Sequence, residues 1–255
     1  MNKSLTLSKI RTKLKEGKSS IGSWLQISDT SVSEIMANSG YEWLVIDLEH
    51  GSISLNQIPD LCRSIELSGC LPLARLPNNN STDCSNILDA GVAGIIIPNI
   101  IDENHLKKII SSASYPPSGM RGVGYSRANL FGANIESYMS WAQKPFIVAQ
   151  IENILAIDNL KNILDIKGLD AVLIGPYDLS ASMGITGDFN NINFKKVIKK
   201  FSKICKEKKV PYGTHIINPS INELKKSILD GYQFVAYSTD AYMLYKASKC
   251  PIYHI

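Results

Sequence analysis

Residues 41–51 read YEWLVIDLEHG, and this short stretch contains the pattern that decides the fold. Its centre, WLVI, is a compact apolar run with β-branched members, which is typical of a buried strand. The run passes directly into Asp47, Glu49 and His50. A buried strand that ends in titratable side chains is typical of an α/β protein with a functional site at the strand ends.

Short apolar runs of this kind alternate with amphipathic segments along the whole chain, which predicts repeated βα units around a parallel sheet. The predicted strands are residues 21–27, 43–47, 71–75, 94–98, 146–150, 171–175, 212–215 and 234–237. The predicted helices are residues 31–38, 55–67, 82–90, 103–112, 135–142, 154–165, 194–208 and 221–229. Several helices begin after a capping serine, such as Ser220, and end at a glycine, such as Gly69.

Eight strands, eight helices and about 250 residues are the dimensions of a (β/α)8 TIM barrel. The chain has 255 residues and shows no linker and no internal repeat beyond the βα alternation, so we expect a single α/β domain over residues 1–255. A doubly wound open sheet is the alternative fold. The absence of a G-x-G-x-x-G after the first predicted strand favours the barrel.

The composition excludes several classes of protein. With 44% hydrophobic and 20% charged residues, the chain is typical of a compact soluble domain rather than a disordered one. Its longest apolar stretch, residues 93–101, is interrupted by Gly94, Pro98 and Asn99, so we expect no membrane span. Residues 1–17 carry scattered basic residues without the apolar core of a secretory signal. We therefore expect a cytoplasmic protein with no membrane partner.

The charge and the cysteines exclude further classes. A net charge of +4 is too small to indicate a nucleic-acid partner. The one basic run, residues 195–209, has apolar residues at helical spacing, so its lysines are predicted to form the solvated face of an amphipathic helix. Five cysteines without a C-x-x-C pair predict buried, reduced thiols rather than a disulfide or zinc framework.

Polar side chains follow four of the predicted strands, at the carboxyl ends where a TIM barrel has its active site. Asp47 and His50 follow the second strand and Arg75 ends the third. Gln150 and Glu152 follow the fifth strand, and the sixth is followed by Gly175, Pro176, Tyr177 and Asp178. The barrel predicts that all of these residues meet at one rim.

Each of these residues also has a structural interpretation. Asp178 after a Gly-Pro turn is typical of a helix N-cap, and Glu152 could cap the helix that begins near Ile154. Arg75 could pair with a neighbouring carboxylate, and His50 could be a structural histidine. Independent caps would not bring two carboxylates, an arginine, a glutamine and a histidine to one rim, so the combination favours an active site.

The residue types indicate enolate chemistry on a 2-oxo acid. Glu152 and Asp178 supply too few ligands for zinc but suit a hard divalent cation, with Mg²⁺, Mn²⁺ and Co²⁺ as candidates. Arg75 would stabilise the enolate, and His50, oriented by Asp47, would move a proton. A Schiff-base route would need a lysine at a strand end, and none of the eight predicted strands ends in one.

Five segments together resemble the metal-dependent class II pyruvate aldolases. The subgroup is that of 4-hydroxy-2-oxoheptanedioate aldolase, 2-dehydro-3-deoxyglucarate aldolase and 2-keto-3-deoxyrhamnonate aldolase, in the phosphoenolpyruvate/pyruvate barrel superfamily. The resemblance covers about residues 22–240. Its segments are VIDLEHG (45–51), LARLP (73–77), YPPSGMRGVG (115–124), AQIEN (149–153) and GPYDLSASMG (175–184).

The resemblance implies a reversible cleavage of a 4-hydroxy-2-oxo acid to pyruvate and an aldehyde. It implies that Glu152 and Asp178 bind the cation, that Arg75 contacts pyruvate and its enolate, and that His50 with Asp47 handles the proton of the aldol hydroxyl.

The resemblance also adds substrate contacts and an assembly. It implies that Gln150 contacts the oxo acid, that the backbone of Gly175, Pro176 and Tyr177 receives its carboxylate, and that Trp24 lines the pocket. Glu49 matches the family's motif too, which leaves open a role beside the metal ligands or a structural role, and no role is assigned to Arg121. It further implies a homo-oligomer, namely a hexamer built as a trimer of dimers.

Two features depart from the family pattern. Many members have a small residue where this chain has Tyr177, so we expect Tyr177 to narrow the pocket or add a hydroxyl. Residues 115–134 form a long connection typical of a lid, a binding loop or an interface element. Residues 125–134 of this connection are shorter than the family pattern suggests, and we expect them to lie at the active-site face, where loops choose the aldehyde.

Three functions follow from this reading. The first is a pyruvate aldolase, a carbon–carbon lyase. The second is a decarboxylase or C–C hydrolase that acts on a 2-oxo diacid, which shares the enolate but needs no aldehyde. The third is a non-catalytic barrel that binds a small acid, which the presence of both metal ligands and a proton-transfer pair disfavours.

Overall fold

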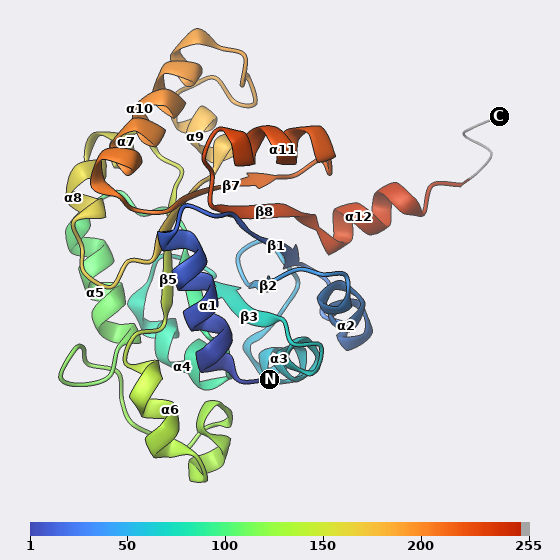
Figure 1. Cartoon of the computed structure of the whole chain (residues 1–255), viewed down its shortest axis with the longest axis vertical. Helices are drawn as coiled ribbons and strands as arrows, with labels where there is room; N and C mark the ends of the chain where they lie inside the picture. The colour runs from blue at the N-terminus through green and yellow to red at the C-terminus, as the bar shows by residue number, and fades with distance from the viewer. Residues whose placement is uncertain (251–255) are drawn as a thin grey trace.

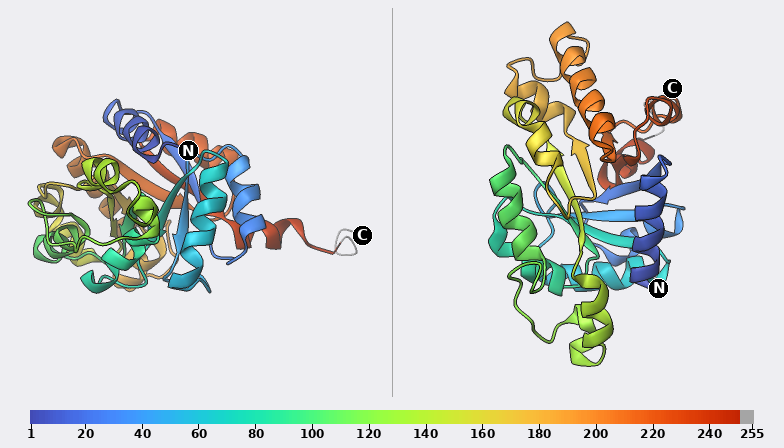
Figure 2. Two further views of the ribbon diagram at one scale, coloured as in Figure 1. Left: turned by 90° about the horizontal axis from the view of Figure 1, so that it is seen from below. Right: turned by 60° about the vertical axis from the view of Figure 1, so that its left-hand side comes forward.

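The strands of the barrel are the first feature that the sequence pattern predicts correctly. The computed structural model describes residues 1–250, and in it eight parallel strands close into a barrel in chain order. Figure 1 shows the strands at the centre with helices around them, and Figure 2 shows the same arrangement from two other sides. Each predicted strand overlaps one of β1 Ser20–Leu25, β2 Trp43–Asp47, β3 Leu71–Arg75, β4 Gly94–Ile97, β5 Phe146–Ile151, β6 Ala171–Ile174, β7 Tyr212–Ile216 and β8 Phe234–Thr239.

The helices are more numerous than the pattern predicts. Helices α1, α9 and α12 were not expected, and the helix expected over residues 154–165 divides at Asn159 into α7 and α8. Short 3-10 segments precede α3, α4 and α6. The α-helices are α1 Lys3–Lys15, α2 Thr30–Asn38, α3 Ile58–Leu67, α4 Cys84–Asp89, α5 Glu103–Ala113, α6 Ile135–Ala142, α7 Ile154–Asp158, α8 Leu160–Leu164, α9 Pro176–Ser182, α10 Ile192–Lys208, α11 Ile221–Leu229 and α12 Asp240–Ala247.

Helix α1 closes the amino-terminal mouth of the barrel. Asn2 caps the helix by accepting a hydrogen bond from the Leu5 backbone N–H at 3.1 Å. Leu7, Ile10 and Leu14 share one face and belong to the same buried cluster as the residues inside the barrel. Because α1 covers this mouth with apolar side chains, the carboxyl-terminal mouth is the end that remains available for a site.

The strands alternate between an inner and an outer face, apart from an irregularity where β1 pairs with β8. Val45, Leu73 and Val148 belong to the cluster inside the barrel, whereas their neighbours pack against the surrounding helices. Near the amino-terminal mouth, the Trp43 and Phe234 rings stack with centroids 4.0 Å apart. On each strand, the inward-facing residue two positions closer to the carboxyl end has a side chain that faces the open mouth.

The connection formed by residues 115–134 lies at the amino-terminal mouth. The expectation that its residues 125–134 lie at the active-site face of the same barrel is therefore wrong. It follows α5 and precedes β5, and segments that run from a helix to the next strand lie at the amino-terminal end of a βα barrel. Arg127 anchors it there through two 2.9 Å contacts with Glu66 at the end of α3. Arg121 is buried, packs on the Tyr115 ring and binds Asp89, which makes it a structural residue of this connection.

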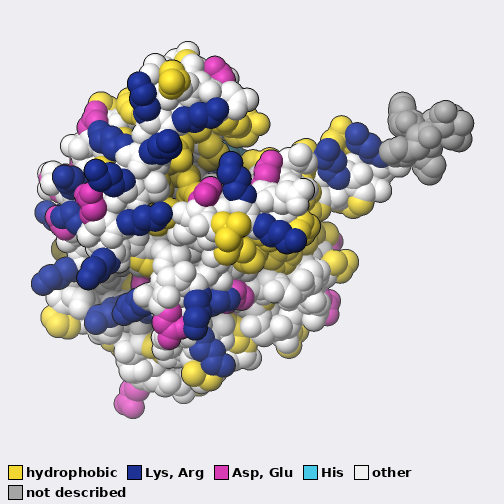
Figure 3. Space-filling model, turned by 45° about the horizontal axis from the view of Figure 1, so that its top comes forward, with side chains coloured by type: hydrophobic (Ala, Val, Ile, Leu, Met, Phe, Trp, Pro, Cys, Tyr) yellow, Lys and Arg dark blue, Asp and Glu magenta, His cyan; other side chains and the backbone are white. Residues whose placement is uncertain are grey.

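Helix α10 confirms the interpretation of the basic run. Its buried face contains Phe194, Phe201, Ile204 and Cys205, whereas its lysines lie outside and pair with acidic residues such as Asp158. On the face of the molecule that Figure 3 shows, Lys and Arg side chains are interspersed with Asp and Glu side chains.

The cysteines and the membrane prediction have mixed outcomes. All five cysteines are free, as expected, but Cys250 is exposed rather than buried. No helix within residues 1–250 is long and apolar enough to span a bilayer.

Candidate active site

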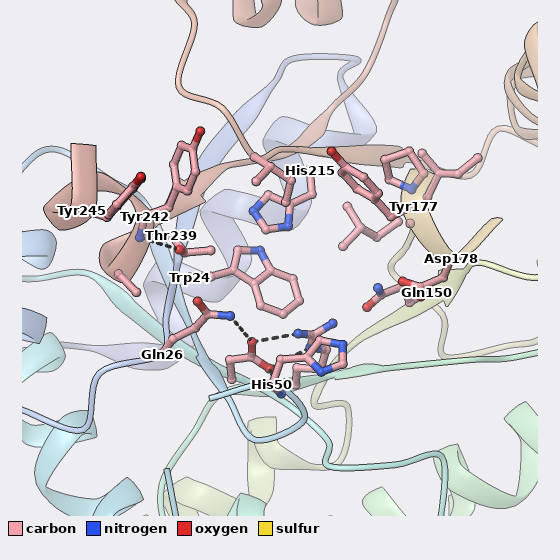
Figure 4. Close-up of a pocket in the computed structure, with 18 residues that line it drawn as sticks. Trp24, Gln26, His50, Gln150, Tyr177, Asp178, His215, Thr239, Tyr242 and Tyr245 are labelled. Atoms are coloured by element: carbon pink, nitrogen blue, oxygen red, sulfur yellow. Dashed lines mark hydrogen bonds and ion pairs between the residues drawn. The ribbon is translucent and has the colours of Figure 1, made fainter. Parts of the chain in front are cut away.

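The carboxyl-terminal mouth contains a cavity of about 600 Å³ that gathers the predicted residues (Figure 4). Every predicted site residue except Glu152 lines it. Glu152 lines an adjoining cavity of about 240 Å³, and His50 and Asp178 line both. The predicted residues in the larger cavity are Trp24, Asp47, His50, Arg75, Gln150, Gly175, Pro176, Tyr177 and Asp178.

Strand alternation explains this convergence. Asp47, Arg75 and Gln150 lie two residues beyond Val45, Leu73 and Val148, all of which face the inside of the barrel. The register of β2 and β3 places Asp47 directly beside Arg75. The inner face of the strands therefore changes from apolar to polar over its last two residues, and this change creates the site.

Arg75 and Asp47 form a bidentate pair at the floor of the cavity. The Arg75 Nε and Nη2 atoms donate to the two Asp47 oxygens at 2.9 and 2.7 Å, and Gln26 donates to the same carboxylate at 3.1 Å. Burial opposes ionisation of Asp47, but the hydrogen bonds and charge of Arg75 outweigh it and hold the pKa of Asp47 below its ordinary value. Asp47 is therefore a fixed anion that orients the guanidinium.

The structural alternative for Arg75, a pair with a neighbouring carboxylate, is thus confirmed, and the pair lies inside the predicted site. The Arg75 Nη1 atom also lies 2.9 Å from a Glu49 oxygen. Burial raises the pKa of Glu49, although the charge of Arg75 partly opposes this. Glu49, to which the sequence assigned no role, therefore completes the set of anions around the guanidinium.

Asp47 contacts His50 differently from the expectation. One Asp47 oxygen accepts hydrogen bonds from the backbone N–H groups of Glu49 and His50, each at 3.2 Å. The donors are backbone groups rather than the imidazole, so these bonds hold the turn after β2 in place. Asp47 thus positions His50 through the backbone, and the ring stands at the rim where the two cavities meet.

Trp24 lies between Arg75 and a histidine that the sequence reasoning missed. The Arg75 guanidinium lies 4.3 Å from the Trp24 ring centroid, and the His215 ring stacks on Trp24 at 5.1 Å with an angle of 9°. The His215 Nε2 atom lies 3.1 Å from the Ser238 carbonyl and donates to it. Burial lowers the pKa of His215 to about 4, so the ring is neutral at pH 7.

Glu152 is held in place by its neighbours and is costly to ionise. Its two oxygens accept hydrogen bonds from the Asn99 backbone N–H and from Gln150 Nε2, each at 2.6 Å. Burial, together with the carboxylates of Glu49 and Asp178, raises the pKa of Glu152 to about 7, although the Asn99 hydrogen bond opposes the shift. An added cation would relieve this repulsion.

Gly175 is required by close packing in this region. A Cβ atom at Gly175 would lie 2.8 Å from a Glu152 oxygen and 3.2 Å from Gln150 Nε2. Gly175 is also the N-cap of α9, with Pro176 at the first helical position. The interpretation of Asp178 as an N-cap is therefore wrong, because Asp178 lies inside the first turn.

The cap interpretation of Glu152 is wrong as well. The N-cap of α7 is Asn153, whose side chain accepts from the Leu155 N–H at 3.0 Å. Both predicted metal ligands are thus free of helix-capping roles. Glu152 faces the smaller cavity, and Asp178 is exposed at the border of the two cavities.

The chemistry of the donors fits a hard cation with few protein ligands. Within residues 1–250 no group of three or more His, Cys, Asp or Glu side chains is arranged to hold a metal ion. A fully protein-coordinated zinc site is therefore absent from this part of the chain. The carboxylates of Glu152 and Asp178 remain, next to a buried Gln150 oxygen that accepts no hydrogen bond.

Sequence reasoning missed several residues of the larger cavity. His215 lies near the end of β7, two residues beyond the inward-facing Gly213, so the same alternation that places Arg75 would have placed it. The others directly follow β1 or β7, end β8, or belong to α12, which was not predicted. These residues are Gln26, Ile217, Thr239, Ala241, Tyr242 and Tyr245.

Comparison with known proteins identifies relatives over nearly the whole chain. Residues 20–247 match the family model described as HpcH/HpaI aldolase/citrate lyase. The chain is 32% identical over 246 residues to a hydroxypyruvate/pyruvate aldolase of Roseobacter denitrificans, with 95% of each chain covered. It is also 32% identical to a 2-keto-3-deoxy-L-rhamnonate aldolase of Salmonella gallinarum, covering 91% of this chain and 86% of that one.

A solved structure has the same fold. The crystal structure of an HpcH/HpaI aldolase/citrate lyase family protein from Burkholderia cenocepacia superimposes with a TM-score of 0.89 at 24% identity, covering 96% of this chain and 98% of that one. The resemblance in the five sequence segments and the expected enzyme class, a carbon–carbon lyase of the aldolase type, are confirmed. With its barrel, its strand-end residues and its matched length, this chain belongs to the HpcH/HpaI aldolase/citrate lyase family.

Proposed function

We propose that this protein is a metal-dependent aldolase that reversibly cleaves a 4-hydroxy-2-oxo acid into pyruvate and an aldehyde. The observation that carries the proposal is the convergence of Arg75, His50 and Asp178 on one cavity, with Glu152 in the adjoining cavity. The volume of about 600 Å³ accommodates a small oxo acid together with an aldehyde.

Glu152 and Asp178 are the residues that would hold the cation. When bound, a divalent cation would polarise the keto group of the oxo acid as a Lewis acid. Mg²⁺, Mn²⁺ and Co²⁺ all suit two carboxylates, and we propose that the protein uses one of these three. Gln150 lies on β5. Its side-chain amide nitrogen donates a hydrogen bond to Glu152, and its side-chain carbonyl oxygen is available to a ligand.

The other residues of the cavity act on the organic substrate. Arg75, oriented by Asp47 and Glu49, stabilises the negative charge that develops on the pyruvate part when the carbon–carbon bond breaks. His50 takes the proton from the hydroxyl group that becomes the aldehyde oxygen, and returns it in the synthetic direction. The backbone of Gly175, Pro176 and Tyr177 at the start of α9 receives the carboxylate of the oxo acid.

Metal removal is the first test of the proposal. Purified protein, treated with EDTA and passed over a desalting column, is expected to lose pyruvate release from a 4-hydroxy-2-oxo acid by at least about a hundredfold. Addition of Mg²⁺, Mn²⁺ or Co²⁺ is expected to restore it, with lactate dehydrogenase reporting the pyruvate. Activity that survives exhaustive chelation would contradict the metal requirement. Faster turnover of oxaloacetate than of any aldol substrate would favour the decarboxylase alternative.

Asp178→Ala separates a metal ligand from a structural residue. Asp178 is exposed, and its side chain forms no hydrogen bond within residues 1–250, so its loss removes only a small helix-dipole contribution of about 0.3–1 kcal/mol. We expect Mn²⁺ affinity to fall by at least about tenfold in calorimetry, with a melting temperature close to that of the wild type. Asp158→Ala, which removes a surface partner of Lys200, is the matched control and should change neither quantity.

The homohexamer and the cytoplasmic location stay predictions. Light scattering coupled to gel filtration measures the first directly. The proposed partners are the small oxo acid, the aldehyde and further copies of this chain.

A further inference from the structure

The side of the larger cavity that lies across from the predicted oxo-acid site is lined by aromatic residues. Tyr242 and Tyr245 of α12 stand opposite Gln150 and Asp178, and Tyr177 stands next to Asp178 with its ring at the cavity wall (Figure 4). Ile217, Thr239 and Ala241 also line this cavity. The metal-binding side has carboxylates, whereas this side has rings and hydroxyl groups.

Positive charge is scarce in this cavity. Among the described residues that line it, Arg75 carries the one permanent positive charge, and its Nε, Nη1 and Nη2 atoms all contact Asp47 or Glu49. Lys246 and Lys249 lie 5.5 and 5.6 Å from ring centroids of tyrosines on α12, but neither lines the cavity. A carboxylate on the aldehyde would therefore lose hydration without gaining an ion pair.

Tyr177 is exposed over 52% of its surface, yet its ring is held in one direction. The Phe189 ring packs edge-on against it with centroids 4.9 Å apart and an angle of 84°. Phe189 in turn packs on the buried Phe194 at 5.5 Å. Ser180 links the same segments, since its hydroxyl donates to the Tyr177 carbonyl and accepts from the Gly187 N–H.

We propose that Tyr177, braced by Phe189, is a specificity-determining residue that limits the aldehyde to a short molecule, and that the cavity disfavours an aldehyde that carries a negative charge. This inference rests on the proposed aldolase function and adds the choice of acceptor. The ring lines the cavity beside Asp178, the proposed metal ligand, so it takes up space that the chain of the aldehyde would otherwise fill. The scarcity of cations on the tyrosine-lined side excludes anionic aldehydes by a separate mechanism.

Three aldehydes distinguish size from charge. Glycolaldehyde is short and uncharged, butanal is longer and uncharged, and succinic semialdehyde has the length of butanal but carries a carboxylate. Aldol addition to pyruvate is measured with each, and each rate is divided by the same variant's rate of pyruvate methyl-proton exchange. The wild type is expected to prefer glycolaldehyde, then butanal, then succinic semialdehyde.

Tyr177→Ala is expected to raise the kcat/KM ratio of butanal to glycolaldehyde by about tenfold or more, because it removes the ring that limits the chain. Tyr177→Phe should retain the wild-type ratio. Phe189→Ala should shift the ratio in the same direction by a smaller factor. The double variant should equal Tyr177→Ala alone, because Phe189 acts only through Tyr177.

Tyr125→Ala is the matched control, since Tyr125 is an exposed tyrosine of the connection at the opposite mouth. Its ratio should equal that of the wild type. A Tyr177→Ala ratio within about twofold of the wild type would overturn the proposal, as would an equal shift in Tyr125→Ala or a wild-type preference for succinic semialdehyde over butanal. If the wild type shows neither methyl-proton exchange nor any aldol product, the proposed function itself fails, and this inference fails with it.

Discussion

Arg75→Ala is expected to lower both aldol cleavage and the exchange of pyruvate methyl protons by about a thousandfold or more. The reason is that both reactions pass through the pyruvate enolate, whose charge the guanidinium stabilises. The exchange is measured without an aldehyde, as deuterium incorporation into pyruvate followed by NMR. The sample contains saturating Mg²⁺ that is free of Mn²⁺. Retained exchange would contradict the role of Arg75.

The same substitution is expected to destabilise the fold, because it leaves the fully buried Asp47 carboxylate without its partner. A cost of about 3–5 kcal/mol in the free energy of unfolding is typical of breaking a buried pair in this way. The double variant Asp47→Asn with Arg75→Ala should recover most of the stability but none of the activity, which separates folding from chemistry. Arg63→Ala, which breaks an exposed pair with Asp60, should change neither quantity.

Glu152→Gln is the second change with a large expected effect. The amide keeps an oxygen for the Asn99 N–H but loses the charge that a cation requires. We expect Mn²⁺ affinity to fall by at least about a hundredfold in calorimetry and activity to fall with it. Unchanged Mn²⁺ affinity would remove Glu152 from the metal site.

The pH dependence of stability gives this variant a second readout. The pKa of Glu152 is about 7 in the folded protein, against an ordinary value of 4.5. Between these two pH values the folded state holds a proton that the unfolded state has released. The stabilisation from this proton is complete below pH 4.5 and is lost as the pH rises through 7. Metal-free wild type should therefore lose free energy of unfolding between these pH values, and Glu152→Gln should lose less. Glu223→Gln, at an exposed position of α11, should keep the wild-type profile.

The local sequence determined the strands and most of the site. Apolar runs such as WLVI can be satisfied only by burial on both faces, and eight of them alternating with amphipathic helices leave few architectures besides the barrel. The same alternation fixed which residues reach the open mouth. Asp47, Arg75 and Gln150 could be assigned because each extends an inward-facing position by two residues.

Elements outside this alternation were harder to predict. The short α9 follows its strand directly, with Pro176 as its first residue and Gly175 as its cap, so its sequence resembles a turn. Helix α1 precedes β1 and so belongs to no βα unit, whereas α12 follows β8 and is not bounded by a second strand within residues 1–250. Tyr242 and Tyr245 were missed because they belong to α12.

The sequence by itself determined the barrel, the mouth that contains the site and the residue types available for chemistry, because these depend on periodicity along the chain. Only the tertiary structure decided which groups touch. In the structure the Asp47 carboxylate binds Arg75 rather than the His50 ring, Trp24 stacks on His215, and residues 125–134 lie at the opposite mouth. These contacts join residues far apart in the chain, and their geometry depends on the closure of the barrel, which no local pattern encodes.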